Sequence, residues 1–292
     1  MNVSNEIIVY SKSKAFLLIT KFRLSLLVVF SAVVSYVTIA ENPRWDVVLY
    51  LSLGGFLITG ASNSFNQIIE KRLDALMDRT KERPMPLEIL SKREAFFFSL
   101  ILTVIGLYFL YLCSFLTALI GLISLLLYVL VYTPLKQKSP WAVFIGAFPG
   151  ALPTLIGAVT GQSQQNAIEF FSTLLFLIQF IWQFPHFWTL AWFNYDDYAK
   201  ADFYLLPSKK KDKFSAFMIF LYTIFLIVAA LMPYFFHFTG ILSTIIIGVA
   251  SFTLLIQVYY FYKMQSDEMS KKLFKTYIIY LPVVQLSIMT RL

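Results

Sequence analysis

The chain has 292 residues, of which 59% are hydrophobic and 14% are charged, and its mean hydropathy is +0.72. A soluble globular protein has about 45–50% apolar and about 25% charged residues, so this composition excludes that class and indicates a membrane protein. The formal net charge of +8 is carried by loops between hydrophobic segments, which is typical of membrane topology rather than of nucleic-acid binding. No nucleic-acid partner is therefore expected.

Nine hydrophobic segments are long enough to cross a bilayer, which takes about 17–25 residues each. The last of them is short, and the third and fourth are nearly fused. They are Leu24–Ala40, Val47–Ile69, Ala95–Cys113, Leu116–Tyr132, Trp141–Thr160, Phe170–Phe193, Ser215–Phe236, Ile241–Tyr262 and Tyr277–Met289. We expect residues 1–292 to form a single all-α integral membrane domain with nine transmembrane helices.

The lysines and arginines test this span count, because cytoplasmic loops collect basic residues. With the N-terminus placed in the cytoplasm, all 24 basic residues except Arg44 and Arg291 fall in inside segments. A wrong number of spans would scatter them over both sides. The sequence therefore predicts a cytoplasmic N-terminus, an outside C-terminus and an outside position for Gln165. No cleavable signal peptide or transit segment is evident, which favours a bacterial plasma (inner) membrane.

Polar residues recur at four-residue steps where the second hydrophobic segment ends. Asn66, Glu70 and Asp74 follow this spacing and would share one helical face. Because like charges on one face repel each other, the pattern indicates a bound cation, and oxygen ligands beside phosphate suit Mg²⁺. Arg79 and Arg83 follow, and their planar guanidinium groups suit phosphate. These features predict a metal and phosphate site at the cytoplasmic end of the bundle.

A second acidic loop follows the sixth hydrophobic segment and contains Asp196, Asp197, Tyr198, Lys200 and Asp202. Both acidic loops follow even-numbered segments, four segments apart. This arrangement indicates a pseudo-repeat in which carboxylates from both halves face one cavity. The alternative for Asp196 is that its carboxylate only balances nearby lysines on a solvated loop.

Three motifs together resemble the protoheme IX farnesyltransferases, a family in the UbiA superfamily of intramembrane prenyltransferases. The motifs are the run from Asn66 to Pro84, the segment Tyr132–Ala158 that begins YTPLK, and the segment Trp182–Phe203 that contains FPHF and YDDYAKADF. The resemblance implies a UbiA-like bundle of nine helices around a central cavity. It also implies Mg²⁺ as cofactor, farnesyl diphosphate as donor and the 2-vinyl group of haem b (protoheme IX) as acceptor, giving haem O and diphosphate.

The resemblance also implies site residues, position by position. The catalytic residues would be Asn66, Glu70, Asp74, Asp197 and Tyr198. Arg79 and Arg83 match the family's basic residues and would bind the diphosphate, and the metal would be bound by Glu70, Asp74 and Asp202. Lys200 is also expected at the diphosphate, as is Lys136, which from its cytoplasmic level could instead pair with haem propionates or only anchor the span. The chain departs from the family pattern at Glu70, where Asp is commoner, and at Tyr195, where other UbiA-type enzymes have Asp. We therefore expect the first acidic motif, Asn66, Glu70 and Asp74, to carry the metal chemistry rather than the second acidic motif, Asp196–Asp202.

Haem binding is expected at His186, in the run Phe184–Pro185–His186–Phe187. A proline bends a helix and can open a cavity, and a neutral imidazole suits haem iron. The alternative is that His186 is a hydrogen-bonded packing residue. Lys21 and Arg23 lie at the cytoplasmic level and could pair with haem propionates, with diphosphate, or with neither if they only anchor the span.

Two alternative functions are consistent with parts of the pattern. A UbiA-type enzyme could prenylate an aromatic quinone precursor, although the FPHF and TPLK contexts favour haem. A cation-coupled transporter would also use acidic loops and broken helices, but the carboxylates here lie at the cytoplasmic edge rather than at the membrane midplane. The expected partners are farnesyl diphosphate, haem b, membrane lipids, and a haem A synthase or terminal oxidase assembly, with the active site facing the cytoplasm.

Overall fold

The computed structural model describes residues 11–162 and 168–290, and every regular element in these ranges is helical. Nine helices in the described ranges are long and apolar enough to cross a membrane, which confirms the predicted number of spans. The chain is thus a multi-pass membrane protein. Gln165 lies outside the described residues, and the orientation of the termini stays a prediction.

Most membrane spans are single helices, whereas two spans are each built from shorter helices in series. The spans are α1 with α2 (Lys12–Ile19 and Phe22–Ile39), α3 (Trp45–Ile69), α5 (Lys92–Cys113), α6 with η1 and α7 (Phe115–Leu126, Leu127–Tyr132 and Thr133–Leu135), α8 (Ala142–Gly161), α9 (Phe170–Phe193), α11 (Lys213–Phe235), α12 (Ile241–Met264) and α13 (Asp267–Thr290). Two short helices lie between spans, namely α4 (Lys71–Asp74) and α10 (Tyr195–Ala199).

The last span is longer than the sequence predicted. Helix α13 has 24 residues, so the expectation of a short span over Tyr277–Met289 was wrong. Its first turns contain Lys271, Lys272 and Lys275, and these charges lower the local hydropathy below that of a membrane segment. The helix continues through them because a helix can extend beyond the hydrocarbon layer once its backbone bonds are formed.

The third and fourth spans are nearly fused, as predicted. Only Ser114 separates α5 from α6, and its backbone is extended at φ −168° and ψ 161°. The Ser114 hydroxyl accepts a hydrogen bond from Thr117 N at 3.0 Å, which caps the start of α6.

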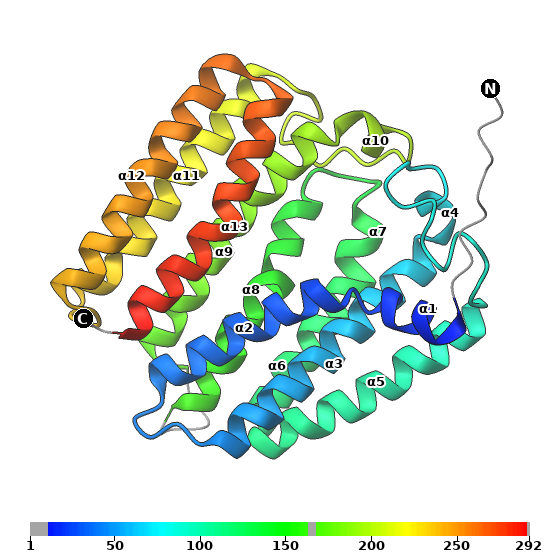
Figure 1. The fold of residues 1–292 in the computed structure, drawn as a ribbon, viewed down its shortest axis with the longest axis horizontal. Coiled ribbons are helices and arrows are strands. Elements are labelled where there is room, and N and C mark those ends of the chain that lie inside the picture. The colour runs from blue at the N-terminus through cyan, green and yellow to red at the C-terminus, as the bar shows by residue number, and fades with distance from the viewer. Residues whose placement is uncertain (1–10, 163–167, 291–292) are drawn as a thin grey trace.

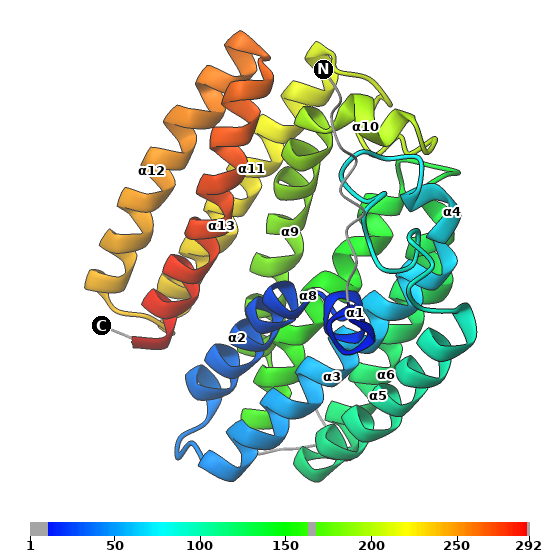
Figure 2. The ribbon, with the colours of Figure 1, turned by 45° about the vertical axis from the view of Figure 1, so that its right-hand side comes forward.

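The helices form two groups that share the central pair α8 and α9 (Figure 1). Helices α11, α12 and α13 pack on one side, and α2, α3, α5 and α6 pack on the other. Figure 2 shows α4 and α10 at the same end of the bundle. The two groups also meet where α2 contacts α13, and there Ser31 Oγ donates to Gln285 Oε1 at 3.2 Å. The short helices α4 and α10, which contain residues of the two acidic motifs, therefore lie at the same end of the bundle.

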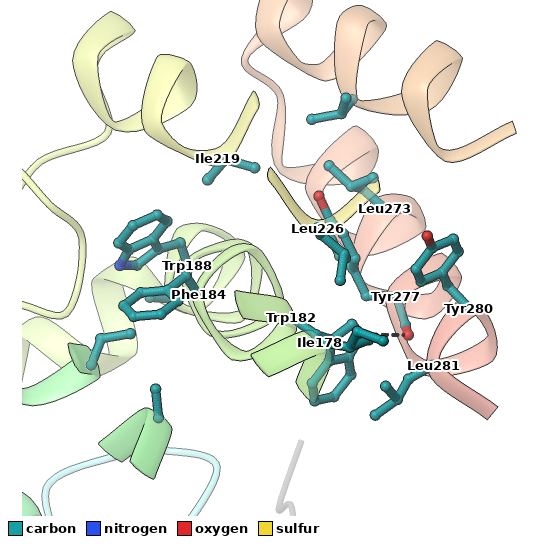
Figure 3. Close-up of a cluster of buried hydrophobic side chains, with 14 of the residues drawn as sticks. Ile178, Trp182, Phe184, Trp188, Ile219, Leu226, Leu273, Tyr277, Tyr280 and Leu281 are labelled. Carbon is teal, nitrogen blue, oxygen red and sulfur yellow. Dashed lines mark hydrogen bonds between the residues drawn. The ribbon is translucent and has the colours of Figure 1, made fainter. Parts of the chain in front are cut away.

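Aromatic packing fixes α9 against α11 and α13. Figure 3 shows Trp182, Trp188 and Tyr277 in one buried cluster with aliphatic side chains from these helices. Trp182 Nε1 donates to the Tyr277 carbonyl at 2.9 Å, so a buried indole N–H is satisfied across the helix interface. This packing sets the position of the C-terminal part of α9, which α10 follows.

Helices α2 and α8 approach each other closely at one glycine. A Cβ atom at Gly157 would lie 1.8 Å from the Ala32 carbonyl oxygen, so no larger residue fits without moving a backbone. Small residues allow helix backbones to pack at this distance in membranes. The contact holds α2, and with it the end of α2 nearest the acidic motifs, against the centre of the bundle.

Candidate active site

The first acidic motif lies where α3 ends. Helix α3 stops at Ile69, and Glu70 has a backbone outside the helical region, at φ −86° and ψ 6°. The four-residue steps nevertheless persist, because Glu70 N donates to Asn66 O at 2.9 Å and Asp74 N donates to Glu70 O at 2.8 Å. Asn66, Glu70 and Asp74 are 2%, 3% and 1% exposed. The three residues keep their four-residue backbone steps and are all buried, although the helix is interrupted within the motif.

Each of the two buried carboxylates is paired with a cation. Lys136 Nζ lies 2.5 Å from Glu70 Oε1, and Arg83 Nη1 lies 2.9 Å and 2.8 Å from the two carboxylate oxygens of Asp74. We refer to Glu70, Asp74, Arg83 and Lys136 as the charge cluster. The cluster joins the first acidic motif, the loop after it and the end of the fourth span, which are all separate in sequence.

A π-helix brings Lys136 to this cluster. Residues 127–132 form η1, and Thr133, which follows it, donates to the Tyr128 carbonyl at 2.8 Å and accepts from Asn66 Nδ2 at 3.2 Å. A π-turn shifts the register of the residues that follow it and is frequent at functional sites. The Tyr132 ring centroid lies 4.9 Å from Lys136 Nζ. Sequence reasoning missed Thr133, and the Thr-Pro pair was the only signal of it.

The second acidic motif binds the loop that follows the first. Asp197 Oδ1 accepts a hydrogen bond from Asp78 N at 2.7 Å, and its Oδ2 accepts one from Arg79 N at 3.3 Å. Arg79 Nη2 also donates to the Tyr198 hydroxyl at 3.5 Å. Lys200 forms ion pairs with Asp78 and, at 3.4 Å, with Asp197. The second motif therefore meets the loop that follows the first, but Asp197 accepts main-chain N–H groups there and does not face another carboxylate as the pseudo-repeat predicted.

The structure does not assemble the predicted set of three metal ligands. Glu70 and Asp74 lie together, whereas Asp202 is exposed and has a left-handed backbone at φ 56°. Within residues 11–162 and 168–290, no group of three or more His, Cys, Asp or Glu side chains is placed to hold a metal ion. The physical reason is that the chain turns at Asp202 and directs it to the surface.

The remaining oxygen groups still fit a hard divalent cation. Glu70 Oε1 is buried and makes no well-directed hydrogen bond, although Lys136 Nζ lies close to it. Asn66 donates through its amide nitrogen, which leaves its carbonyl oxygen as an acceptor. Two carboxylates and one amide oxygen are the donor types that Mg²⁺ takes when phosphate oxygens and water complete its coordination.

The loop residues outside the spans have shifted pKa values. The hydrogen bond from Lys200 lowers the pKa of Asp78 to about 2, and the same contact raises the pKa of Lys200. Burial raises the pKa of the Tyr198 hydroxyl, while the Arg79 charge opposes this shift. Tyr198 is therefore protonated at neutral pH and can donate a hydrogen bond.

The two cations predicted to bind haem are placed differently. Lys21 is partly buried in the break between α1 and α2, and the nearby Ile19 carbonyl accepts a hydrogen bond from Gln67, three residues before Glu70. Arg23 is exposed on the first turn of α2. Lys21 therefore lies with the residues predicted to bind diphosphate.

His186 is held between two aromatic rings. Its imidazole stacks on Trp182 with centroids 4.2 Å apart and an interplanar angle of 19°, and on Phe274 at 4.8 Å and 25°. The Nδ1 atom is buried and has no hydrogen-bond partner. The side chain is thus well packed, but it lacks the Nδ1 hydrogen bond expected of a purely structural histidine.

Solved structures share this fold. A structure described for digeranylgeranylglyceryl phosphate synthase in membranes has a TM-score of 0.80 at 20% identity, covering 96% of this chain and 98% of that chain. A UbiA homologue from Archaeoglobus fulgidus bound to GPP and Mg²⁺ has a TM-score of 0.64 at 13% identity, covering 94% of this chain and 99% of that chain. At these identities the likeness concerns the fold alone.

Sequence relatives define the family more closely. The model of the UbiA prenyltransferase family matches residues 26–279. A protoheme IX farnesyltransferase of Christiangramia forsetii is 44% identical over 92% of this chain and 90% of the relative, and one of Flavobacterium psychrophilum is 42% identical over 91% and 90%. The chain belongs to the UbiA prenyltransferase family and, within it, to the protoheme IX farnesyltransferases.

Proposed function

We propose that this chain transfers a farnesyl group from farnesyl diphosphate to the 2-vinyl group of haem b, giving haem O and diphosphate. The charge cluster is the observation that carries the proposal, because two buried carboxylates and two cations meet at one end of a nine-span bundle in a chain of this family. Residues 1–292 act as one domain in a bacterial plasma membrane, with the site facing the cytoplasm. A haem A synthase or terminal oxidase assembly would receive the product.

We assign the metal site to the first acidic motif. The carboxylates of Glu70 and Asp74 and the amide oxygen of Asn66 would hold Mg²⁺, and a UbiA homologue of the same fold that is bound to GPP and Mg²⁺ supports the choice of this ion. When bound, the ion would neutralise charge that develops on the diphosphate as the allylic C–O bond breaks. Asp202 is left out of the set because it is exposed.

The chain's own cations would hold the diphosphate. Arg83 and Lys136 are fixed within the charge cluster, and Arg79 lies on the loop that Asp197 secures. Cations fixed before the reaction stabilise the departing charge without further reorganisation. We assign Lys200 to the loop instead, since its amine is taken by Asp78 and Asp197.

Aromatic rings next to the cluster suit the cation left on the farnesyl group. Tyr128 and Tyr132 have ring centroids 5.2 Å apart, and burial keeps the Tyr198 hydroxyl protonated through its raised pKa. Ring faces stabilise positive charge and exclude water from a reactive carbocation. Tyr198 would keep Arg79 oriented, and the tyrosine rings would shield the carbon that the acceptor attacks.

The acceptor is expected near His186. A neutral imidazole with an unpaired Nδ1 suits haem iron or a polar edge of the macrocycle. The names of the curated relatives favour haem over an aromatic quinone precursor. The family is one of prenyltransferases, which disfavours a cation-coupled transporter.

Purified full-length protein in lipid nanodiscs tests the proposal. With haem b, farnesyl diphosphate and Mg²⁺, we expect haem O by mass spectrometry and free diphosphate in equal amounts. A parallel reaction contains 4-hydroxybenzoate in place of haem. Prenylation of that acid without any haem product would overturn the haem assignment and favour the quinone-precursor enzyme.

A further inference from the structure

The first span is broken next to the charge cluster. Helix α1 ends at Ile19 and α2 begins at Phe22. Between them, Lys21 adopts the left-handed conformation, with φ 49° and ψ 56°, which glycine adopts far more readily than lysine. Figure 1 shows the break where α1 and α2 cross α3. Strained residues of this kind cluster at ligand sites and switch regions.

Helix α3 satisfies the backbone groups that the break leaves free. Gln67 Nε2 donates to the Ile19 carbonyl at 2.9 Å, and Asn63 Nδ2 donates to the Thr20 carbonyl at 3.4 Å. Ser25 Oγ also donates to the Thr20 carbonyl, at 2.9 Å. A broken helix at membrane depth requires such partners, because no bulk water is present to replace them. The two buried amides of α3 therefore maintain the break.

The break places a third cation beside the charge cluster. Lys21 follows Ile19 by two residues, and the Ile19 carbonyl accepts its hydrogen bond from Gln67, which lies one turn before Glu70 on the same chain segment. Glu70 and Asp74 are already balanced by Lys136 and Arg83, so a protonated Lys21 would give the group an excess of positive charge. An excess of fixed positive charge favours a multiply charged anion. The amide Gln67 and the cluster carboxylate Glu70 lie three residues apart, so one helix end organises both.

We propose that Lys21 is a diphosphate-binding residue and that Asn63 and Gln67 are positioning residues, which hold the backbone break that presents its amine. The inference rests on the proposed function, since the anion is taken to be an allylic diphosphate. When the bond between C1 and the diphosphate oxygen breaks, the electron pair leaves with the diphosphate, and the Lys21 amine stabilises that charge. In this proposal Lys21 binds the diphosphate and not the haem propionates.

Substitutions at position 21 separate this role from a structural one. Lys21→Gly removes the amine but relieves the left-handed backbone, so a structural position would tolerate it. We expect its melting temperature to be equal or higher, while its affinity for magnesium diphosphate, measured by calorimetry on the full chain in nanodiscs, falls at least about tenfold. Lys21→Met should lose as much, and Lys21→Arg should stay within about threefold.

A lysine elsewhere provides the charge control. Lys92→Met removes an exposed cation from the start of α5, and its diphosphate affinity should stay within about twofold of wild type. Unchanged diphosphate affinity in Lys21→Gly, or an equal loss in Lys92→Met, would overturn the inference.

A double-mutant cycle tests the positioning residues. Gln67→Met removes the donor to the Ile19 carbonyl, and we expect about fivefold weaker diphosphate binding in the wild-type background but less than about twofold in the Lys21→Met background. Equal losses in both backgrounds would show that Gln67 acts without Lys21. Gln257→Met removes an interhelical contact with Thr276 and should show no coupling. If Gln67→Met does not fold, Asn63→Ala carries the same cycle.

These results remain distinct from the test of the proposed function, because diphosphate binding requires no haem. Lys21-dependent diphosphate binding in a protein that makes no haem O would retain the inference and overturn the function. Normal haem O formation together with unchanged diphosphate binding in Lys21→Gly would retain the proposed function and overturn the inference about Lys21.

Discussion

Arg83 Nη1 contacts both carboxylate oxygens of Asp74, at 2.9 Å and 2.8 Å, and the Asp74 side chain is 1% exposed. The two residues are separated by a turn of the loop in which Thr80 Oγ1 also donates to the Asp74 carbonyl at 2.8 Å. Removal of one partner of a buried ion pair leaves the other charge uncompensated. Asp74 therefore orients Arg83 in addition to its proposed role toward Mg²⁺.

Replacement of this carboxylate should remove most of the activity. Asp74→Asn keeps the shape and removes one negative charge, and we expect turnover at least about a hundredfold lower, equivalent to about 2.7 kcal/mol of transition-state stabilisation. The measurement is haem O formed per unit of folded protein, with saturating Mg²⁺ and with chelator. Asp267→Asn, which removes an ion pair with Lys211, is the control and should retain turnover. Full activity in Asp74→Asn, or activity independent of Mg²⁺, would contradict the mechanism.

Glu70 allows a finer test because it departs from the commoner family residue. Glu70→Asp keeps the charge, and its turnover should stay within about tenfold of wild type. Glu70→Gln removes the charge that faces Lys136 Nζ at 2.5 Å, so its turnover should fall as far as in Asp74→Asn. Glu88→Gln removes an exposed carboxylate paired with Lys71 and serves as the control. Equal turnover in Glu70→Gln and wild type would show that the Glu70 charge takes no part in the reaction and only balances Lys136.

The spans and the first motif could be predicted from the sequence because both depend on local patterns. Hydropathy finds apolar helices, and four-residue spacing places Asn66, Glu70 and Asp74 together wherever the backbone stays close to helical. The α1–α2 break could not be predicted in this way. In the sequence, Lys21 looks like an ordinary lysine that anchors the end of a span. Its left-handed backbone depends on amide side chains from another helix.

The second acidic motif shows a different limit of prediction from the sequence. A carboxylate can bind a metal ion or accept main-chain N–H bonds, and both roles place acidic residues in loops. Asp197 takes the second role through Asp78 N and Arg79 N, and Asp202 is turned to the surface. Spacing along the chain cannot distinguish these outcomes because they depend on how two distant loops meet.

The contact of Asp197 with the first loop should protect that loop from proteolysis. Asp197→Ala removes both acceptors, and we expect cleavage by trypsin at Arg79 or Lys81 to become at least about fivefold faster, with turnover reduced. Asp196→Ala, at an exposed neighbouring position, is the control. Equal cleavage rates in the two variants would show that Asp197 does not secure the loop.

The ion pair between Asp78 and Lys200 lies in the same loop, and the pKa values of the two groups set the pH range over which the pair persists. The lowered pKa of Asp78, about 2 against 3.8, makes its ion pair fully present above pH 3.8 and lost as the pH falls through about 2. The raised pKa of Lys200 makes its contribution fully present below pH 10.5. Loop protection, measured by hydrogen exchange of residues 75–83, should therefore be constant between pH 5 and pH 8. A transition within that range would contradict the assignment of this ion pair.

Thiol labelling tests the orientation of the bundle. Cys113 is the only cysteine, so Cys113→Ser provides a background without thiols. In that background, Asn42→Cys in the exposed α2–α3 loop should react with an impermeant maleimide on intact cells, because the basic residues place this loop outside. Glu82→Cys should react only after the membrane is ruptured. The opposite pattern would reverse the topology and place the charge cluster on the outer face.

His186 can be tested without disturbing its packing. His186→Phe keeps a ring between Trp182 and Phe274 but removes both ring nitrogens. If the imidazole contacts haem, this variant and His186→Ala should both change the haem absorption spectrum of the purified protein or lower turnover at least about tenfold. His237→Ala, at an exposed position, should change neither. If His186→Phe matches wild type in spectrum and turnover while only His186→Ala is impaired, His186 is a packing residue and haem binds elsewhere.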